Sequence, residues 1–321
     1  MKGRCLYCYE EINAEELSTP AGTKGYHEKC SRKFFGKASP PTLPLTQDQL
    51  LEFASQIVKT HKTVTGVQPK LSLGVAKDGK PPLRFTIMGI LGEYILKPQT
   101  EMYANLPENE DLCMHLAQLS KIKTVDHGLI RLQSGELAYL TKRVDRIKGK
   151  KLHMEDMCQL TERLTEYKYR GSYEQIAKAI KRYSVNPGLD LIDFFEVVLF
   201  SFLTGNNDAH LKNFSLLKTK IGYQLCPAYD LVASALVVED DNEELALSLN
   251  GKKRKLKRKD FEIAMTGAGI PARAMENLFR KYQKLIPQWK PLIQKSFLPA
   301  TSQEALEDLI QQRSMQLGLH E

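Results

Sequence analysis

The sequence predicts an α+β protein with two lobes, a β-rich lobe followed by a mainly helical one. Between residues 71 and 144, several short segments alternate apolar and polar residues, which is typical of strands. After residue 154, apolar residues recur mostly at helical spacing. The apolar fraction of 42% and the charged fraction of 26% fit a globular protein. We therefore expect a small Cys/His segment (1–38), a β-rich lobe (39–146) and a helical lobe (147–321).

The Cys/His segment carries two pairs of residues that commonly bind zinc. Cys5 and Cys8 form a C-x-x-C pair, and His27 and Cys30 follow after a gap of 18 residues. Two such pairs match the way a tetrahedral zinc ion organises a short segment, and three thiolates with one imidazole would form a closed structural site. The alternative is that these residues belong to a small apolar cap without metal. Six cysteines are too few for a disulfide scaffold in a chain of 321 residues.

The β-rich lobe begins with an extended strap, because Pro40, Pro41 and Pro44 do not permit a helix there. The segment from Thr46 to Gln49 then predicts a capping box that begins a helix. Strands are predicted over residues 71–75, 83–87, 93–98, 125–132 and 136–144, with a helix over residues 107–121 after the third strand.

Two positions in this lobe could meet phosphate groups. Gly66, in the turn before the first strand, would let the backbone approach a ligand closely, although a plain hairpin turn explains it equally well. Lys97 ends the third strand and could contact phosphates, but a lysine at a strand end is often simply solvent-exposed. The sequence does not distinguish Glu108 from Glu110 as the ion-pair partner of Lys97.

The helical lobe contains one segment, residues 189–203, that is apolar nearly all round and is therefore predicted to be a central buried helix. A short hairpin is expected over residues 214–225. Helices are predicted over residues 154–166, 173–183, 189–203, 258–267, 271–285 and 302–317.

The polar loop after the central helix is the strongest candidate for a catalytic site. Asp208 could accept a proton from a hydroxyl group, and Asn213 and Asp230 could supply oxygen ligands to a hard cation. A phosphotransferase needs a base and cation ligands in this order if magnesium is to hold ATP phosphates beside a positioned hydroxyl. The alternative is an ordinary turn in which Asp208 only accepts hydrogen bonds from backbone N–H groups.

The net charge of +8 comes largely from a basic run at residues 252–259. Such a run could bind nucleic acid, an acidic protein or a membrane surface, or it could be a solvated loop. No stretch has the length and apolar character of a membrane span, and the N-terminus lacks the pattern of a signal peptide. We therefore expect a cytoplasmic protein.

These motifs together resemble the HipA-like serine/threonine kinases, the toxin components of bacterial toxin–antitoxin modules. The D-x-H-x-x-N loop also occurs in lipid kinases, whereas the full set, in the family's order, is specific to this group. The matching segments are Gly66-Val67-Gln68-Pro69-Lys70, Ile95-Leu96-Lys97-Pro98, Lys142-Arg143-Val144-Asp145-Arg146, Glu155-Asp156-Met157-Cys158-Gln159, Asn207-Asp208-Ala209-His210-Leu211-Lys212-Asn213-Phe214-Ser215 and Tyr229-Asp230-Leu231-Val232.

The resemblance implies a bilobal, protein-kinase-like fold, a role for ATP and magnesium, and a function for each matching position. Asp208 would be the catalytic base, and Asn213 and Asp230 would bind magnesium. Lys97 would contact ATP phosphates, and His210 would order the loop. The hinge backbone from Lys142 to Val144 would meet adenine. Thr63 and Thr65 stand where the family phosphorylates itself on serine. The full ATP-binding set is Thr65, Gly66, Val67, Gln68, Lys70, Lys97, Lys142, Arg143, Val144, His210 and Lys212.

The layout is similar to the short HipT-type toxins of three-gene systems. This similarity implies a small HipS-like partner, a DNA-binding HipB-like antitoxin, and an aminoacyl-tRNA synthetase as the substrate. Two other functions remain open on the residues: a nucleic-acid-binding protein on an inactive kinase-like fold, and a small-molecule or lipid kinase.

Overall fold

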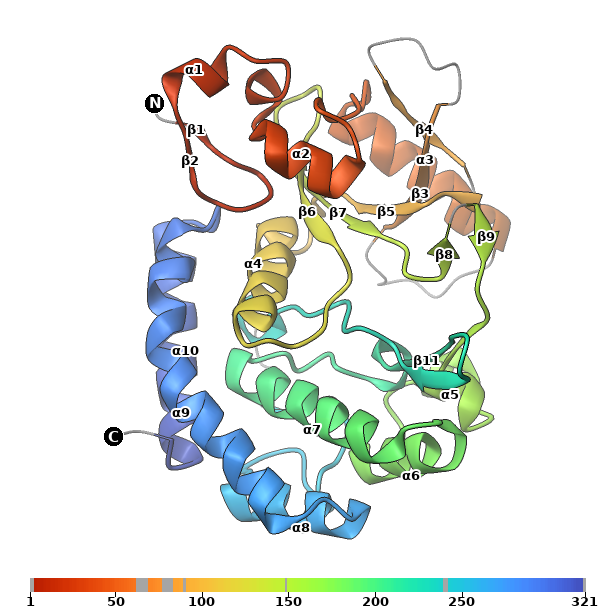
Figure 1. The fold of residues 1–321 in the computed structure, drawn as a ribbon, viewed down its shortest axis with the longest axis vertical. Helices are drawn as coiled ribbons and strands as arrows, with labels where there is room; N and C mark the ends of the chain where they lie inside the picture. Colours follow the sequence, from red (N-terminus) through yellow and green to blue (C-terminus); the bar gives the residue numbers. More distant parts are fainter. Residues whose placement is uncertain are drawn as a thin grey trace. The chain divides into compact units, whose positions relative to one another are not determined.

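A five-stranded antiparallel sheet lies at the centre of the N-terminal half of the computed structural model (Figure 1). The structure describes residues 3–61, 69–76, 83–88, 91–147, 149–238 and 242–319. The strand order is β4-β3-β5-β7-β6, and each neighbouring pair is antiparallel. All five predicted strands are confirmed: β3 Leu71–Val75, β4 Phe85–Ile87, β5 Tyr94–Lys97, β6 His127–Arg131 and β7 Leu137–Lys142.

The chain divides into two units. Unit 1 contains residues 1–111, 125–143 and 295–297, and unit 2 contains residues 112–124, 144–294 and 298–321. The boundary at residues 143 and 144 falls within the predicted hinge. Helix α4 (Leu106–Leu119), predicted over residues 107–121, contributes its first turns to unit 1 and its remainder to unit 2.

The Cys/His segment shares one hydrophobic core with the sheet of unit 1. Phe34 and Phe35 are buried with residues of β3, β5 and β6 in the same cluster, and the Phe34 ring lies 6.0 Å from that of Tyr94. The segment therefore buries apolar side chains against the sheet. Its elements are β1 Gly3–Arg4, β2 Glu11–Ile12, α1 Ala14–Leu17 and α2 Glu28–Phe35.

Helix α3 (Gln47–His61) begins as the sequence predicts. The Thr46 N–H donates to Gln49 Oε1 at 3.0 Å, and the Gln49 N–H donates to Thr46 Oγ1 at 3.4 Å, which completes the capping box. Leu50 and Ala54 are buried, whereas Phe53 is 38% exposed.

Unit 2 is built around α7 (Pro187–Thr204), whose residues from Leu191 to Thr204 are nearly all buried, as predicted. Its other main helices are α6 (Tyr173–Tyr183), α8 (Arg258–Ala268), α9 (Ala272–Lys295) and α10 (Ala300–Gln316). The predicted hairpin is present as β11 (Ser215–Lys218) and β12 (Tyr223–Leu225). A two-stranded ribbon, β8 (Arg146–Ile147) with β9 (Lys150–Lys151), follows the hinge. None of the described helices combines the length and apolar composition needed to cross a bilayer.

Two helix predictions in this half were wrong in extent. Residues 154–166 do not form one helix: β10 (Met154–Asp156) pairs with β11, and α5 (Met157–Leu160) lasts only four residues before Glu162 adopts a φ of +55°. Helix α9 continues ten residues past its predicted end at residue 285, through two prolines. Burial of Trp289 and Ile293 offsets the hydrogen bonds that those prolines remove.

Candidate active site

The loop that carries Asp208 begins at a glycine with a left-handed backbone conformation. Gly205 caps the C-terminus of α7 with a φ of +69°, a conformation that side chains rarely adopt. A Cβ atom there would also lie 2.4 Å from the Leu309 side chain. The end of the central helix therefore fixes the direction in which the loop starts.

Hydrogen bonds to buried groups hold the loop on both sides of Asp208. The Asn207 N–H donates to Ser234 Oγ at 2.8 Å, and the Tyr173 hydroxyl donates to the Ala209 carbonyl at 3.0 Å. Asn207 and Ala209 are buried, whereas Asp208 itself is exposed. These hydrogen bonds hold the backbone on both sides of the exposed Asp208 carboxylate, which could accept a proton from a substrate within hydrogen-bond reach.

The Asp208 carboxylate accepts a hydrogen bond from a residue that the sequence analysis missed. The Tyr169 hydroxyl donates to Asp208 Oδ1 at 2.5 Å, and the Tyr169 ring meets the His210 ring edge-on at 5.0 Å. Tyr169 lies in an irregular segment without a recognisable motif, 39 residues before Asp208. Asp208 Oδ1 is therefore positioned to accept a proton from an O–H group.

The two predicted magnesium ligands are brought together. Asn213 Nδ2 donates to Asp230 Oδ2 at 2.7 Å, and Asn213 Oδ1 accepts the His210 N–H at 3.0 Å. Asp230 adopts a φ of +59°, a strained conformation for a residue other than glycine and one that clusters at functional sites. A carboxylate beside an amide oxygen is a suitable donor set for a hard cation such as magnesium.

His210 is a structural member of this loop. Burial lowers the pKa of its imidazole, so the ring is neutral at physiological pH. Its Nδ1 is buried and has no hydrogen-bond partner within the described part of the chain. The neutral ring meets Tyr169 edge-on and carries no charge to the site. Its ordering role stays a prediction.

Lys212, predicted to contact ATP, takes part in an ion pair. Its Nζ donates to Asp156 Oδ2 at 2.5 Å, and Asp156 also caps α5 by accepting the Gln159 N–H at 3.0 Å. The Lys212 carbonyl accepts the Tyr229 hydroxyl at 3.0 Å. Asp156 and Tyr229 thus hold Lys212 in place. Both lie in segments that match the family, but the sequence analysis assigned neither residue a role.

Lys97 in unit 1 forms a buried ion pair with Glu110. The Lys97 Nζ lies 2.7 and 2.9 Å from the two carboxylate oxygens, and the side chains are 8% and 0% exposed. The structure therefore selects Glu110 over Glu108, whose pKa is raised by burial. A strand lysine paired with a helix glutamate is the arrangement that protein kinases use.

The hinge residues already use two of their backbone donors. The N–H groups of Lys142 and Arg143 donate to the carbonyls of Asp126 and Glu93, each at 2.8 Å. Adenine recognition by this segment would therefore fall to its carbonyls and to the Val144 backbone. Lys70 is exposed at the start of β3. The remaining predicted loop residues, Thr63, Thr65, Gly66, Val67 and Gln68, lie outside the described residues.

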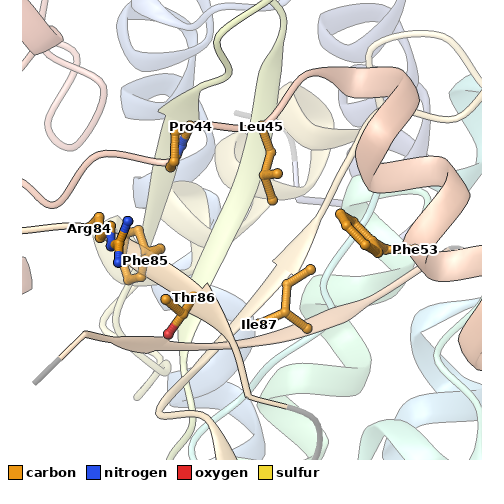
Figure 2. Close-up of a pocket in the computed structure, with 7 residues that line it drawn as sticks. All are labelled: Pro44, Leu45, Phe53, Arg84, Phe85, Thr86 and Ile87. Atoms are coloured by element: carbon orange, nitrogen blue, oxygen red, sulfur yellow. The ribbon is translucent and has the colours of Figure 1, made fainter.

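An apolar hollow of about 460 Å³ in unit 1 is not this candidate site (Figure 2). Phe53 of α3 and Ile87 of β4 lie near each other along it, and the strap contributes Pro44 and Leu45. None of the predicted catalytic or ATP-binding residues that the structure describes lines it.

The basic run at residues 252–259 is partly neutralised by acidic neighbours. Lys252 pairs with Asp260 at 2.7 Å and Lys253 with Glu243 at 3.0 Å. Arg258 Nε lies 2.8 Å from a Glu262 oxygen. These pairs reduce the positive charge that the run could offer to a nucleic acid.

Comparison with known proteins identifies relatives. The family described as "HipA-like C-terminal domain" matches residues 63–289. A Haemophilus influenzae protein named "Putative kinase" is 29% identical over 254 residues, which cover 75% of this chain and 71% of that protein. The "Serine/threonine-protein kinase toxin HipA" of Shewanella oneidensis is 28% identical over 252 residues, covering 72% of this chain but only 57% of the toxin.

The solved structure of Shewanella oneidensis HipA with HipB and its operator DNA matches the fold. The TM-score is 0.66 at 22% identity, covering 82% of this chain and 70% of that one. This likeness confirms the predicted α+β, kinase-like fold.

Proposed function

The chain belongs to the family of proteins with a HipA-like C-terminal domain, and from this premise we propose that it is an ATP- and magnesium-dependent protein serine/threonine kinase. The observation that carries the proposal is the geometry of the loop after α7. There an exposed carboxylate, Asp208, is held by a rigid backbone next to the hydrogen-bonded pair of Asn213 and Asp230.

Asp208 would act as the base. A substrate serine hydroxyl would donate its proton to Asp208 Oδ1, which already accepts the Tyr169 hydroxyl. The serine oxygen would bond to the γ-phosphorus of ATP as the bond to the bridging oxygen breaks and ADP leaves. The Tyr169 hydroxyl would compete with the substrate hydroxyl for this oxygen.

Asn213 and Asp230 would hold magnesium. The Asp230 carboxylate and the second lone pair of Asn213 Oδ1 are hard oxygen donors, and their closeness supports this assignment. Bound magnesium would neutralise charge on the ATP phosphates. Lys97 would contact those phosphates, with Glu110 fixing the position of its ammonium group. Lys142, Arg143 and Val144 would border adenine.

We extend the proposal to the chain's biological partners. Shewanella HipA has been crystallised with HipB and operator DNA, which supports a HipB-like antitoxin as a partner. A HipS-like small protein is a second expected partner, and an aminoacyl-tRNA synthetase is the expected substrate, so that phosphorylation would stop translation in the cytoplasm. Thr63 and Thr65 are the candidate positions for autophosphorylation.

The nucleic-acid-binding alternative has less support. Three side chains of the basic run are paired with carboxylates, and the catalytic residues of an inactive fold would have no reason to be assembled as they are. The Lys97–Glu110 pair in unit 1 and the Asn213–Asp230 pair in unit 2 each support the kinase proposal instead.

The test is phosphate transfer from [γ-32P]ATP with magnesium to a panel of purified aminoacyl-tRNA synthetases. We expect label on one synthetase with the wild type and with Asp308→Asn, which changes an exposed carboxylate on α10. Asp208→Asn should give none. Label on the chain alone would place the substrate elsewhere, and equal transfer by Asp208→Asn would refute the assignment of the base.

A further inference from the structure

We propose that Cys5, Cys8, His27 and Cys30 bind one zinc ion, and that this zinc site positions the kinase glutamate Glu110 through Tyr9. The metal site concerns residues that the phosphotransfer reaction does not use. The positioning role rests on the proposed kinase function, whereas zinc binding does not.

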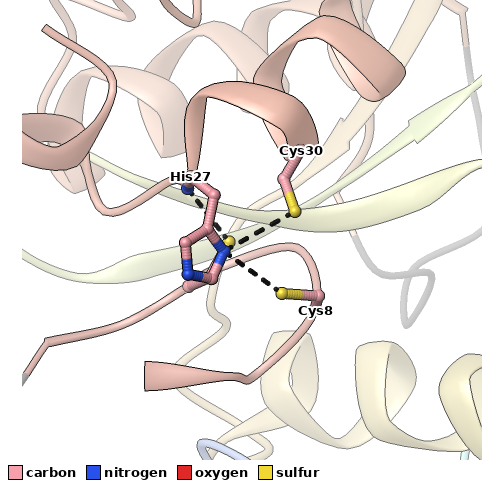
Figure 3. A group of neighbouring side chains, drawn as sticks. Cys8, His27 and Cys30 are labelled. Carbon is pink, nitrogen blue, oxygen red and sulfur yellow. Dashed lines mark hydrogen bonds between the residues drawn. The ribbon is translucent and has the colours of Figure 1, made fainter. Parts of the chain in front are cut away.

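The distances between the four side chains fit a tetrahedral zinc ion. All four ligand atoms lie within 4.8 Å of one another. The His27 Nδ1 lies 3.4 Å from Cys8 Sγ and 3.7 Å from Cys30 Sγ, and the ring points between these two sulfurs (Figure 3). Zinc with bonds of about 2.3 Å to sulfur and about 2.0–2.1 Å to nitrogen requires a sulfur–nitrogen separation of about 3.5 Å. The two measured distances lie on either side of this value.

The hydrogen bonds around His27 prepare its Nδ1 as a ligand. Its Nε2 lies 3.1 Å from the Glu11 carbonyl, which can only accept, so Nε2 carries the proton and Nδ1 presents its lone pair to the sulfurs. The His27 backbone N–H also points at Cys5 Sγ, at 3.5 Å. Such a contact stabilises a thiolate, the form in which cysteine binds metal.

The backbone at Cys5–Cys8 directs both sulfurs to the same point. The Tyr9 N–H donates to the Cys5 carbonyl at 2.9 Å, and Tyr9 adopts a φ of +64°. This tight turn is strained for tyrosine, and a metal bond across it would offset the strain. Cys5, His27 and Cys30 are buried and Cys8 is half-buried, and all three cysteines are free of disulfides. Four protein ligands leave no open position, so the site would be structural.

Tyr9 also connects the cluster of zinc ligands to α4. The Tyr9 hydroxyl donates to Asp111 Oδ2 at 2.7 Å, and Asp111 Oδ1 contacts His127 Nδ1 at 2.7 Å. Asp111 directly follows Glu110, which holds Lys97. Without zinc, the turn would lose its anchor and Tyr9 would no longer fix this end of α4. All these residues belong to unit 1.

Small segments with little core of their own often depend on metal for their structure. The Cys/His segment has two-residue strands and one helix of eight residues, and its remaining burial comes from the neighbouring sheet. The alternative, an apolar cap with free thiols and no metal, gives no reason for His27 Nδ1 to point at the sulfurs of Cys8 and Cys30.

The first experiment measures zinc in the purified full-length chain by mass spectrometry of metals. We expect one zinc per chain in the wild type and in Cys226→Ala, which removes a buried cysteine outside the cluster. The double variant Cys8→Ser/Cys30→Ser should contain almost none. Cobalt substitution should give the intense sulfur-to-metal absorption of a thiolate site. A folded wild type without zinc after growth in zinc-supplemented medium, or a double variant that keeps its zinc, would overturn the metal site.

The second experiment tests the positioning role with Tyr9→Phe, which keeps every ligand. Zinc content should be unchanged, whereas amide hydrogen exchange across residues 106–111 should become faster. The kcat for phosphotransfer should fall about tenfold with the KM for ATP nearly unchanged, corresponding to loss of one hydrogen bond to a charged group. Unchanged exchange and unchanged kcat would refute the positioning role. If the wild-type chain bound zinc but had no kinase activity, the metal site would be supported and the proposed function would be refuted.

Discussion

Removal of the Glu110 charge should destabilise unit 1 and impair catalysis together. Glu110→Gln keeps the shape of the side chain but leaves the Lys97 ammonium buried without its counter-charge. Both side chains are almost fully removed from solvent, so water cannot compensate. Loss of one partner of a buried ion pair costs about 3–5 kcal/mol.

This free energy can be converted into a melting temperature. Each kcal/mol lowers the Tm of a domain of comparable size by about 2–4 °C, so we expect a decrease of roughly 6–20 °C. The ammonium group of Lys97 would also lose its fixed position, and misplacement by about 1 Å costs roughly 10²-fold in rate.

A paired substitution separates stability from catalysis. Lys97→Met with Glu110→Leu removes both charges and should restore much of the lost stability. The reason is that two buried apolar side chains do not carry the free-energy cost of removing two charges from water. Phosphotransfer should stay defective, because no cation remains for the phosphates. Calorimetry and label transfer measure the two effects. Wild-type Tm and rate in Glu110→Gln would refute the reasoning, as would full activity in the double variant.

Three further predictions concern the loop after α7. Asn213→Ala should reduce kcat by about 10²-fold or more at saturating ATP, because one oxygen donor for magnesium is lost; label transfer measured over a range of magnesium concentrations checks this. Tyr169→Phe removes the hydroxyl that donates to Asp208 Oδ1, so the kcat/KM for the protein substrate should rise by up to about tenfold. A kcat/KM below that of the wild type would show that Tyr169 orients the base instead. Burial lowers the pKa of His210, so the unfolded state binds a proton to this side chain more readily than the folded state does. The free energy of unfolding should therefore not depend on this group above about pH 6.5, and it should decrease as the pH falls below that value. Urea titrations at several pH values should show a weaker decrease for His210→Gln than for the wild type.

The sequence was sufficient to predict the helices and strands whose apolar residues recur at regular spacing. The five strands of unit 1 follow from alternation, and α6 was predicted at its observed bounds. The structure adds that Ser172 caps α6 by accepting the Gln175 N–H. Segment 154–156 was assigned to a helix because three residues carry too little periodicity to reveal a strand. Its pairing with β11 is a contact between residues about 60 apart in sequence.

Long-range packing determines the parts of the site that the sequence could not reveal. Glu108 and Glu110 have the same chemistry, and only the packing of α4 selects Glu110 as the partner of Lys97. Tyr169 lies in an irregular segment without a motif, and α6 and α7 separate it in sequence from Asp208, whose carboxylate it contacts. Asn213 and Asp230, in contrast, were recognisable by residue type and order. Their hydrogen bond brings the expected ligand pair together, while their binding of magnesium stays a prediction.

The most direct test of the central claim is calorimetric titration of the chain with AMP-PNP, a non-hydrolysable ATP analogue, with and without magnesium. The account predicts one nucleotide per chain in the presence of magnesium. Asp230→Asn should bind at least tenfold more weakly because it loses a charged ligand, and Asp308→Asn should match the wild type. Absence of magnesium-dependent binding in a folded wild-type chain, or equal affinity in Asp230→Asn, would contradict the account.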